Sequence, residues 1–130
     1  TRFEGDLAAL MLAVATGTLA HAERPLFSHQ AALTIVMAGN GYPAAPEKGG
    51  AVGLAEVSGA MVFHAGTAEI NGQLVAIGGR VLNVTATGAD VTEAQAAAYA
   101  AVDCIDFPGG FCRKDIGWRE VAREAALGTL

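Results

Sequence analysis

Apolar residues near the start of the chain recur at the spacing of an α-helix. Within residues 7–14, leucine, methionine and valine follow one another at intervals of three and four. Asp6, directly before this segment, is typical of a helix N-cap, and Gly17 is typical of the left-handed residue that ends a helix. The rest of the helix is alanine, so we expect it to pack against neighbours on two sides.

Extended segments follow this helix. Residues 31–38 form a continuous apolar run rich in β-branched side chains, which is typical of a strand covered on both faces. Residues 39–53 are rich in glycine, proline and alanine and predict a long loop. Residues 60–65 are the next candidate strand.

The strongest turn signal in the chain is Asn71-Gly72, which stands between two apolar runs. This pair favours a type I′ hairpin turn, because both of its central residues need a positive φ. Residues 74–77 then return antiparallel. Gly78 and Gly79 interrupt the pattern, and residues 80–87 form a further strand. The prediction is a three-strand meander.

Two more helices are predicted in the second half of the chain. Asp90 and Glu93 have the spacing of a capping box, and the alanines that follow mark one face of a helix. An extended piece is expected at residues 111–113. The apolar spacing between Trp118 and Ala125 predicts a final short helix.

These elements predict an α+β fold: an antiparallel sheet, made of one strand plus the three-strand meander, with helices packed on one face. The length of 130 residues fits a single domain over residues 1–130. No internal repeat is visible in the sequence.

Composition narrows the function. The formal net charge is −5 and no basic stripe runs along the chain, so we expect no nucleic-acid partner. No segment reaches the roughly 18 apolar residues of a membrane span, so we expect no membrane partner. Cys104 and Cys112 match no common zinc spacing. They would pair in a secreted domain, but reduced thiols in a cytosolic protein are the favoured interpretation.

Two short segments have the chemistry of an anion site. His64 to Thr67 follow a strand with a glycine, which can expose backbone N–H groups as an anion nest, and Thr67 adds a hydroxyl. In the second segment Gly78 and Gly79 allow close backbone approach, and Arg80 offers a planar fork to phosphate. Each segment, taken alone, is more typical of a plain surface turn than of a binding site.

The predicted hairpin joins these two segments. If the Asn71-Gly72 turn forms, both segments lie at the end of the hairpin opposite the turn, which makes a plausible anion site. Arg113 and Asp115 are second-tier candidates. They form either a solvated ion pair or a further contact to an anion or to another domain. No catalytic residue and no metal ligand is predicted, since His21 and His29 have no ligand-like spacing.

Five blocks in a fixed order carry a family resemblance. They are Val36-Met37-Ala38 with Gly41-Tyr42-Pro43 and Glu47-Lys48-Gly49; residues 62–67; residues 78–85 with Gly88; Glu93-Ala94 with Ala98-Tyr99; and residues 113–119. Together they resemble the C-terminal domain of the phosphoribosylamine–glycine ligases (glycinamide ribonucleotide synthetases).

The resemblance implies the C-terminal domain of an ATP-grasp ligase. Residues 1–20 would be a helical lead-in from the ATP-grasp core, and residues 30–126 the C-terminal domain itself. The whole enzyme would act in the cytoplasm, in purine biosynthesis. It would convert ATP, glycine and 5-phosphoribosylamine to glycinamide ribonucleotide, ADP and phosphate. ATP and magnesium would bind to the full-length enzyme and no cofactor to this domain, so the chain alone is expected to be inactive.

The resemblance also implies roles for single residues. Arg80 would be the main cation for the ribose phosphate, and the segments around it would line the site. These lining residues are Gly66, Thr67, Gly78 and Gly79, with His64 as a weaker candidate. Gly66 and Thr67 stand where some relatives carry a lysine. The partners would be the amino-terminal and ATP-grasp domains and the small molecule phosphoribosylamine. Two alternatives remain: a non-catalytic interaction module, or the C-terminal domain of another ATP-grasp purine enzyme.

Overall fold

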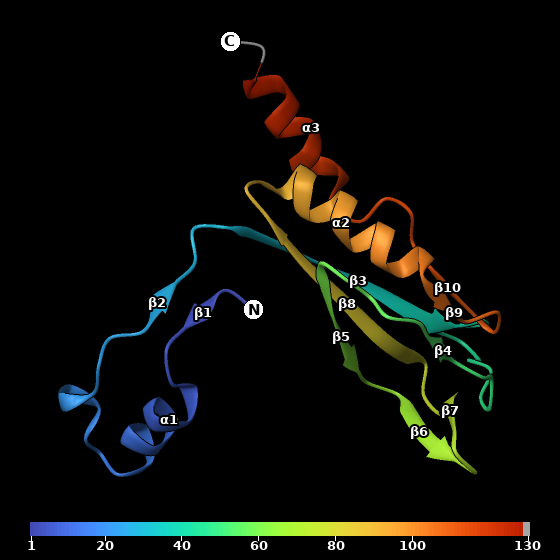
Figure 1. Cartoon of the computed structure of the whole chain (residues 1–130), viewed down its shortest axis with the longest axis horizontal. Coiled ribbons are helices and arrows are strands. Elements are labelled where there is room, and N and C mark those ends of the chain that lie inside the picture. Colours follow the sequence, from blue (N-terminus) through green and yellow to red (C-terminus); the bar gives the residue numbers. More distant parts are fainter. Residues whose placement is uncertain (129–130) are drawn as a thin grey trace.

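A computed structural model describes residues 1–128 and shows a body of sheet and helix with a smaller lobe beside it (Figure 1). The body is built on a four-stranded antiparallel sheet with the strand order β10-β3-β8-β5. These strands are β3 (Ala31–Gly39), β5 (Ala60–His64), β8 (Arg80–Gly88) and β10 (Gly110–Cys112). The expected α+β class with an antiparallel sheet is confirmed.

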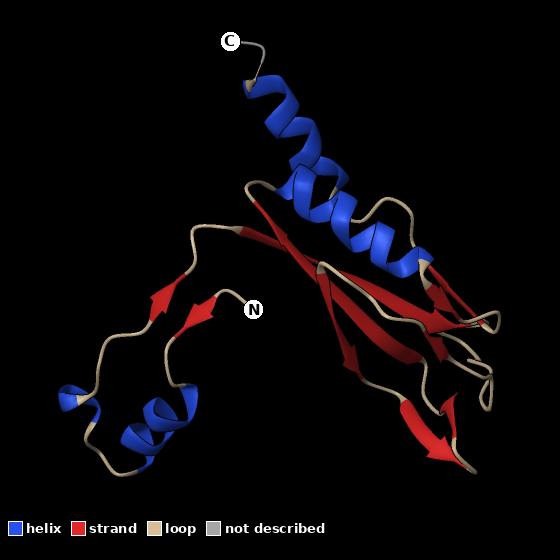
Figure 2. Cartoon of the chain, in the orientation of Figure 1, coloured by secondary structure: helices blue, strands red, loops and turns tan. Residues whose placement is uncertain are grey.

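One face of the sheet is covered by α2 (Val91–Asp103) (Figure 2). The alternation of β3 and β8 turns branched residues toward this helix, and Ile35 and Val84, which are register partners, are both fully buried. The helix meets them with Ala94, Ala98 and Ala101, all buried. Alanine on the contact face lets the helix lie close to the strands, so the core is thin and dense.

The opposite face of the sheet is open. Thr34 on β3 is exposed, and so are Met61 and Phe63 on β5. The expectation that the first long strand is covered on both faces is therefore wrong at Thr34, the one exposed residue of β3. The reason lies outside the segment itself, because α2, the helix that packs on β3, covers only one face of the sheet.

The capping box predicted for α2 is confirmed. The Asp90 carboxylate accepts a hydrogen bond of 2.8 Å from the Glu93 N–H, and the Glu93 carboxylate accepts one of 2.9 Å from the Ala89 N–H. Side chains thereby satisfy one N–H group in the first turn of the helix and one just before the N-cap.

The hairpin predicted around Asn71-Gly72 is also confirmed. It joins β6 (Thr67–Ile70) to β7 (Gln73–Ala76), and Ile70 pairs with Gln73 across the turn. Asn71 has φ 53° and Gly72 has φ 75°, which are the left-handed values that a type I′ turn requires.

The pairing of these strands differs from a meander. β5 pairs directly with β8, and β6 pairs with β7, so the four strands form one long hairpin with an inner half, β5 and β8, and an outer half, β6 and β7. The pairing continues from one half to the other, because the Gly66 N–H donates to the Arg80 carbonyl oxygen over 2.9 Å. Residues without side chains at Gly66 and Gly78 let both strands turn together at this point.

Short elements complete the body and form the lobe. They are β4 (Gly53–Leu54), paired with β9 (Ile105–Asp106), α3 (Trp118–Leu127), and in the lobe β1 (Phe3–Glu4), α1 (Leu7–Ala15), η1 (Leu19–His21) and β2 (Leu26–Phe27), where β1 pairs with β2. Figure 1 shows the lobe set apart from the sheet and joined to it through the segment between β2 and β3.

The cap residues of α1 are confirmed, and its expected packing is wrong. The Asp6 carboxylate accepts a hydrogen bond of 2.8 Å from the Ala9 N–H, and Gly17 has φ 71°. Of the nine helical residues only Ala13 is buried, and the side chains of Met11 and Leu12 are 65% and 64% exposed. The lobe has only two short strands and one turn of 3₁₀ helix to set against a helix that is apolar all round.

The last helix, α3, packs mainly on α2. Its Glu124 carboxylate accepts hydrogen bonds of 2.9 Å from the N–H groups of both Val91 and Thr92, and one of 2.7 Å from the Thr92 hydroxyl. The hydroxyl bond, followed by that from Val91, lowers the pKa of Glu124 below its ordinary value. A carboxylate from α3 therefore caps the start of α2.

No helix within residues 1–128 has the length and apolar character needed to cross a membrane.

We expect the docking of α3 to depend on the charge of Glu124. A carboxyl group whose pKa is lowered by folding stabilises the fold above its unfolded pKa of about 4.3, and this stabilisation is lost as the pH falls through the folded value. Trp118, the single tryptophan, opens α3. Its fluorescence should report the release of α3 in a titration from pH 7 to pH 2.5, with a midpoint below the unfolded pKa.

Glu124→Gln is the matched control, because it keeps the shape and removes the charge. In this variant the transition should disappear. The remaining changes should come from Asp115 and Glu120, whose pKa values are also lowered, by Arg113 and Arg123 respectively. An unchanged titration in Glu124→Gln would contradict a role for this carboxylate in holding α3.

Candidate anion-binding site

The two segments singled out in the sequence meet at the bend of the long hairpin. The Gly66 carbonyl oxygen accepts hydrogen bonds from the N–H groups of Ile77, over 2.8 Å, and Gly78, over 3.2 Å. A Cβ atom placed on Gly66 would lie 2.7 Å from the Gly78 Cα and 2.6 Å from the Arg80 carbonyl oxygen. The bend therefore brings residues 64–67 and 78–80 side by side, as the hairpin predicted.

His64 and Thr67 lie on the first side of the bend. The Nδ1 atom of His64 is 3.0 Å from the Thr67 hydroxyl oxygen, in an exposed hydrogen bond. The imidazole ring and the hydroxyl group thus hold each other at the surface. Both are groups that can donate a hydrogen bond to an anion when they are suitably protonated.

The backbone nest expected at this side is wrong for two of its N–H groups. The Ala65 N–H donates to the Val81 carbonyl oxygen over 3.0 Å, and the Gly66 N–H donates to that of Arg80. Continued strand pairing uses these donors, so they are not available to a ligand. On the second side, the Gly79 N–H has no hydrogen-bond partner within residues 1–128 and is available.

Arg80 lies at a β-bulge. Met37 pairs with Leu82 while Ala38 pairs with Arg80, so Val81 is the extra residue of β8. Val81 is fully buried and Arg80 is exposed. A bulge re-aims the side chains beside it. The Arg80 guanidinium has no hydrogen bond or ion pair with any described residue, so its fork is free to bind an anion.

Tyr42 is a residue of this site that sequence reasoning missed. A Cβ atom on Gly79 would lie 2.7 Å from Cδ2 of the Tyr42 ring and 3.3 Å from Cγ of Pro46. The tyrosine ring therefore packs directly on the glycine that precedes Arg80. The signals in the sequence were an aromatic residue between glycine and proline, within a segment predicted as loop, and the place of Gly41-Tyr42-Pro43 among the blocks of the family resemblance.

The structure does not bring Arg113 and Asp115 to the bend. They follow β10, which is separated from β8 by β3. The Arg113 guanidinium donates to both carboxylate oxygens of Asp115, over 2.9 and 2.7 Å. This bond raises the pKa of Arg113 and lowers that of Asp115. The arrangement is that of an exposed, self-contained ion pair.

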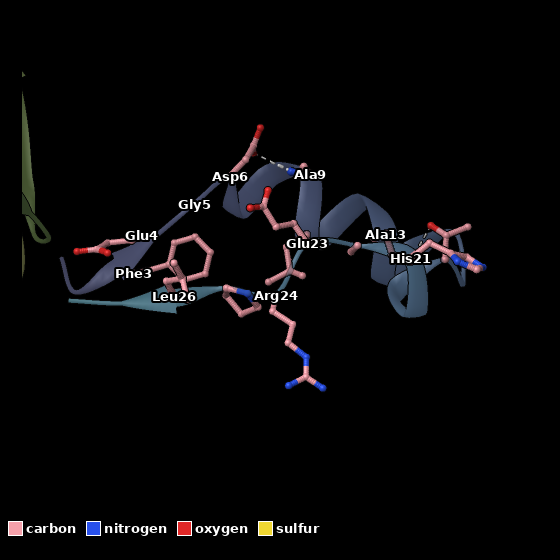
Figure 3. A pocket seen from close by; sticks show the side chains of 14 residues that line it. Phe3, Glu4, Gly5, Asp6, Ala9, Ala13, His21, Glu23, Arg24 and Leu26 are labelled. Atoms are coloured by element: carbon pink, nitrogen blue, oxygen red, sulfur yellow. Dashed lines mark hydrogen bonds between the residues drawn. The ribbon is translucent and has the colours of Figure 1, made fainter. Parts of the chain in front are cut away.

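A cavity of about 470 Å³ lies elsewhere, in the lobe between α1 and the β1-β2 pair (Figure 3). Its lining includes the apolar residues Phe3 and Leu26, and the charged residues Glu4, Asp6, Glu23 and Arg24. Three acidic residues against one arginine disfavour an anionic ligand. Within residues 1–128 no group of three or more potential ligands could hold a metal ion, and both cysteines are free thiols.

Comparison with known proteins gives consistent relatives. Residues 32–119 match the family described as "Phosphoribosylglycinamide synthetase, C domain". The chain is 56% identical over 128 residues to a phosphoribosylamine–glycine ligase of Mesorhizobium japonicum, covering 96% of this chain and 30% of that protein. It is 46% identical over 129 residues to a chloroplastic phosphoribosylamine–glycine ligase of Arabidopsis thaliana, covering 95% and 24%.

A solved structure has the same fold. The crystal structure of a phosphoribosylamine–glycine ligase from Thermotoga maritima matches with a TM-score of 0.69 and 34% sequence identity, covering 82% of this chain and 27% of that one. The chain thus spans about 30% of the length of the curated relatives it matches.

We expect Gly66→Ala to disturb the bend. The added methyl group would meet two backbone atoms of the opposite strand at well under van der Waals distance, and overpacking of this kind costs about 1–3 kcal/mol of unfolding free energy. The measurement is urea unfolding of the purified chain, followed by far-ultraviolet circular dichroism.

Gly109→Ala is a suitable control, because a methyl group there would lie 3.6 Å from the Phe107 ring, at ordinary contact distance. Its unfolding free energy should change by less than about 0.5 kcal/mol. Equal losses in both variants would show that the close approach at Gly66 is no special constraint.

Proposed function

The chain belongs to the phosphoribosylglycinamide synthetase C-domain family, and on this premise we propose that it is the C-terminal part of a phosphoribosylamine–glycine ligase. In the proposed reaction ATP phosphorylates the carboxylate of glycine. The amine of 5-phosphoribosylamine then attacks the acyl phosphate, a C–N bond forms, the acyl C–O bond breaks, and phosphate leaves. The products are glycinamide ribonucleotide, ADP and phosphate, and the amine releases its proton to solvent.

The role of this chain in that reaction is binding. ATP and magnesium are proposed to bind to the rest of the ligase, and this domain closes over the ribose phosphate. The observation that carries the proposal is the unpaired Arg80 fork at the hairpin bend, beside the free Gly79 N–H and the Thr67 hydroxyl. A phosphate ester presents three oxygens and close to two negative charges, which these donors fit.

The domain division is part of the proposal. We assign residues 1–20 to a lead-in from the ATP-grasp part and residues 30–126 to the C-terminal domain. The family match over residues 32–119 supports the second range. The exposed apolar side chains of α1 support the first, because a helix that is apolar all round is normally buried. Its covering partner is then the remainder of the ligase.

The compartment and the two alternative functions can be judged from the same features. We place the enzyme in the cytoplasm, and the two free thiols agree with a reducing compartment. A pure interaction module would give Arg80 no ligand to bind. The C-terminal domain of another ATP-grasp purine enzyme is less well supported, because the named relatives are phosphoribosylamine–glycine ligases.

We expect Arg80→Ala in the full-length ligase to impair use of phosphoribosylamine selectively. Hydrogen bonds to charged groups contribute about 1.5–3 kcal/mol. Loss of the fork should therefore lower kcat/KM for phosphoribosylamine roughly 10- to 100-fold, with KM for ATP within about twofold. Arg80→Lys should restore part of the loss, because lysine keeps the charge without the fork. Steady-state kinetics with each substrate varied in turn provide the measurement.

Arg119→Ala is the control for loss of an exposed arginine. Arg119 lies on α3 over the Trp118 ring, 5.4 Å from its centroid, and its loss should leave all kinetic constants within about twofold. If Arg80→Ala behaves like Arg119→Ala, the phosphate binds elsewhere in the ligase.

A further inference from the structure

A loop with no assigned role in the proposed site lies against the bend. Residues 40–50, here called the 40–50 loop, connect β3 to the segment before β4. The loop begins beside the bend, because the Gly39 N–H donates to the Gly79 carbonyl oxygen over 2.9 Å. The Tyr42 ring then packs on Gly79, as described above. The loop and the residue before Arg80 are therefore in direct contact.

Hydrogen bonds fix the far end of the loop as well. The Glu47 N–H donates to the Asn40 carbonyl oxygen over 2.8 Å, which closes the loop on itself. Gly49 and Ala76 tie it to β7: the Gly49 N–H donates to the Ala76 carbonyl oxygen over 2.7 Å. Lys48 stands between these two anchored residues, so the structure defines the position of its backbone.

This position is next to the bend. A Cβ atom on Gly39 would lie 3.0 Å from the Glu47 carbonyl oxygen and 3.8 Å from the Gly78 carbonyl oxygen. The backbones of Glu47 and Gly78 thus flank the same glycine. Lys48 follows Glu47 directly, so its flexible four-carbon stem starts one residue from a backbone that lies with Gly78 against Gly39.

The charge of Lys48 is not used inside the chain. Lys48 is exposed, and its ammonium group has no hydrogen bond or ion pair with any described residue. Lys114, the other lysine of the chain, differs: its ammonium lies 4.0 Å from an Asp103 carboxylate oxygen and 5.9 Å from the centroid of the Tyr99 ring. Lys114 is therefore a control for the loss of an exposed lysine that lies outside the proposed site.

We propose that Lys48 is a second cation of the anion site and binds the same phosphate as Arg80. The inference rests on the proposed function and adds a binding residue to it. Arg80 contributes a planar fork and Lys48 a mobile point charge, and together they balance the two charges of a phosphate ester. The Tyr42 ring lies against Gly79 and so connects the 40–50 loop to the bend.

The test uses the full-length ligase with Lys48→Ala, Arg80→Ala and the double variant. KM is measured for phosphoribosylamine and for ATP, and ribose 5-phosphate serves as a stable competing ligand. Lys48→Ala should raise KM for phosphoribosylamine and the inhibition constant of ribose 5-phosphate about 5- to 30-fold, with kcat and KM for ATP within twofold. Lys48→Arg should restore both constants to within about threefold, and Lys114→Ala should change neither.

The double variant shows whether the two cations share a ligand. Contacts to one phosphate are coupled, so the double effect should differ from the product of the single effects by at least about threefold. Independent, multiplicative effects would overturn the shared site. So would a normal KM in Lys48→Ala, or an equal rise in KM for ATP, when Arg80→Ala is selectively impaired. Normal phosphoribosylamine kinetics in both single variants would instead overturn the proposed function itself.

Discussion

The arrangement depends on one close approach of two backbones. At the bend of the long hairpin, Gly66 and Gly78 lie so near each other that any side chain on Gly66 would overlap the opposite strand. Because neither residue has a Cβ atom, the paired strands can change direction together while their hydrogen bonds continue. The inner half of the hairpin, β5 with β8, stays in the sheet under α2, and the outer half, β6 with β7, projects from it (Figure 1).

This close approach places polar groups at the edge of the body, where the hairpin leaves the four-stranded sheet. The bulge at Val81 buries that residue and leaves Arg80 at the surface. Tyr42 packs on Gly79 and brings the 40–50 loop to the same place. The bend therefore gathers the exposed Arg80, the free Gly79 N–H group and the hydrogen-bonded pair of His64 and Thr67. In the proposed function this part of the chain binds one end of a substrate while another part of the ligase performs the reaction.

Features decided by neighbouring residues could be predicted from the sequence. The caps at Asp6 and Asp90 and the turn at Asn71-Gly72 depend on local hydrogen bonds and φ values, and all three were found. Pairing of β5 with β8 depends on residues far apart in the chain, so a local pattern predicted a meander instead. The contact of Tyr42 with Gly79 and the free surface of α1 are likewise tertiary, and no local pattern predicts them. At the site, the sequence predicted that residues 64–67 and 78–80 lie side by side. It did not predict that the Ala65 and Gly66 N–H groups bond to the opposite strand.

A crystal structure of the full-length ligase with ribose 5-phosphate would show whether the hairpin bend holds a phosphate group. We expect phosphate oxygens about 2.7–2.9 Å from the Arg80 guanidinium nitrogens, in front of Gly79. A phosphate bound at other residues, with Arg80 directed into solvent, would contradict this expectation.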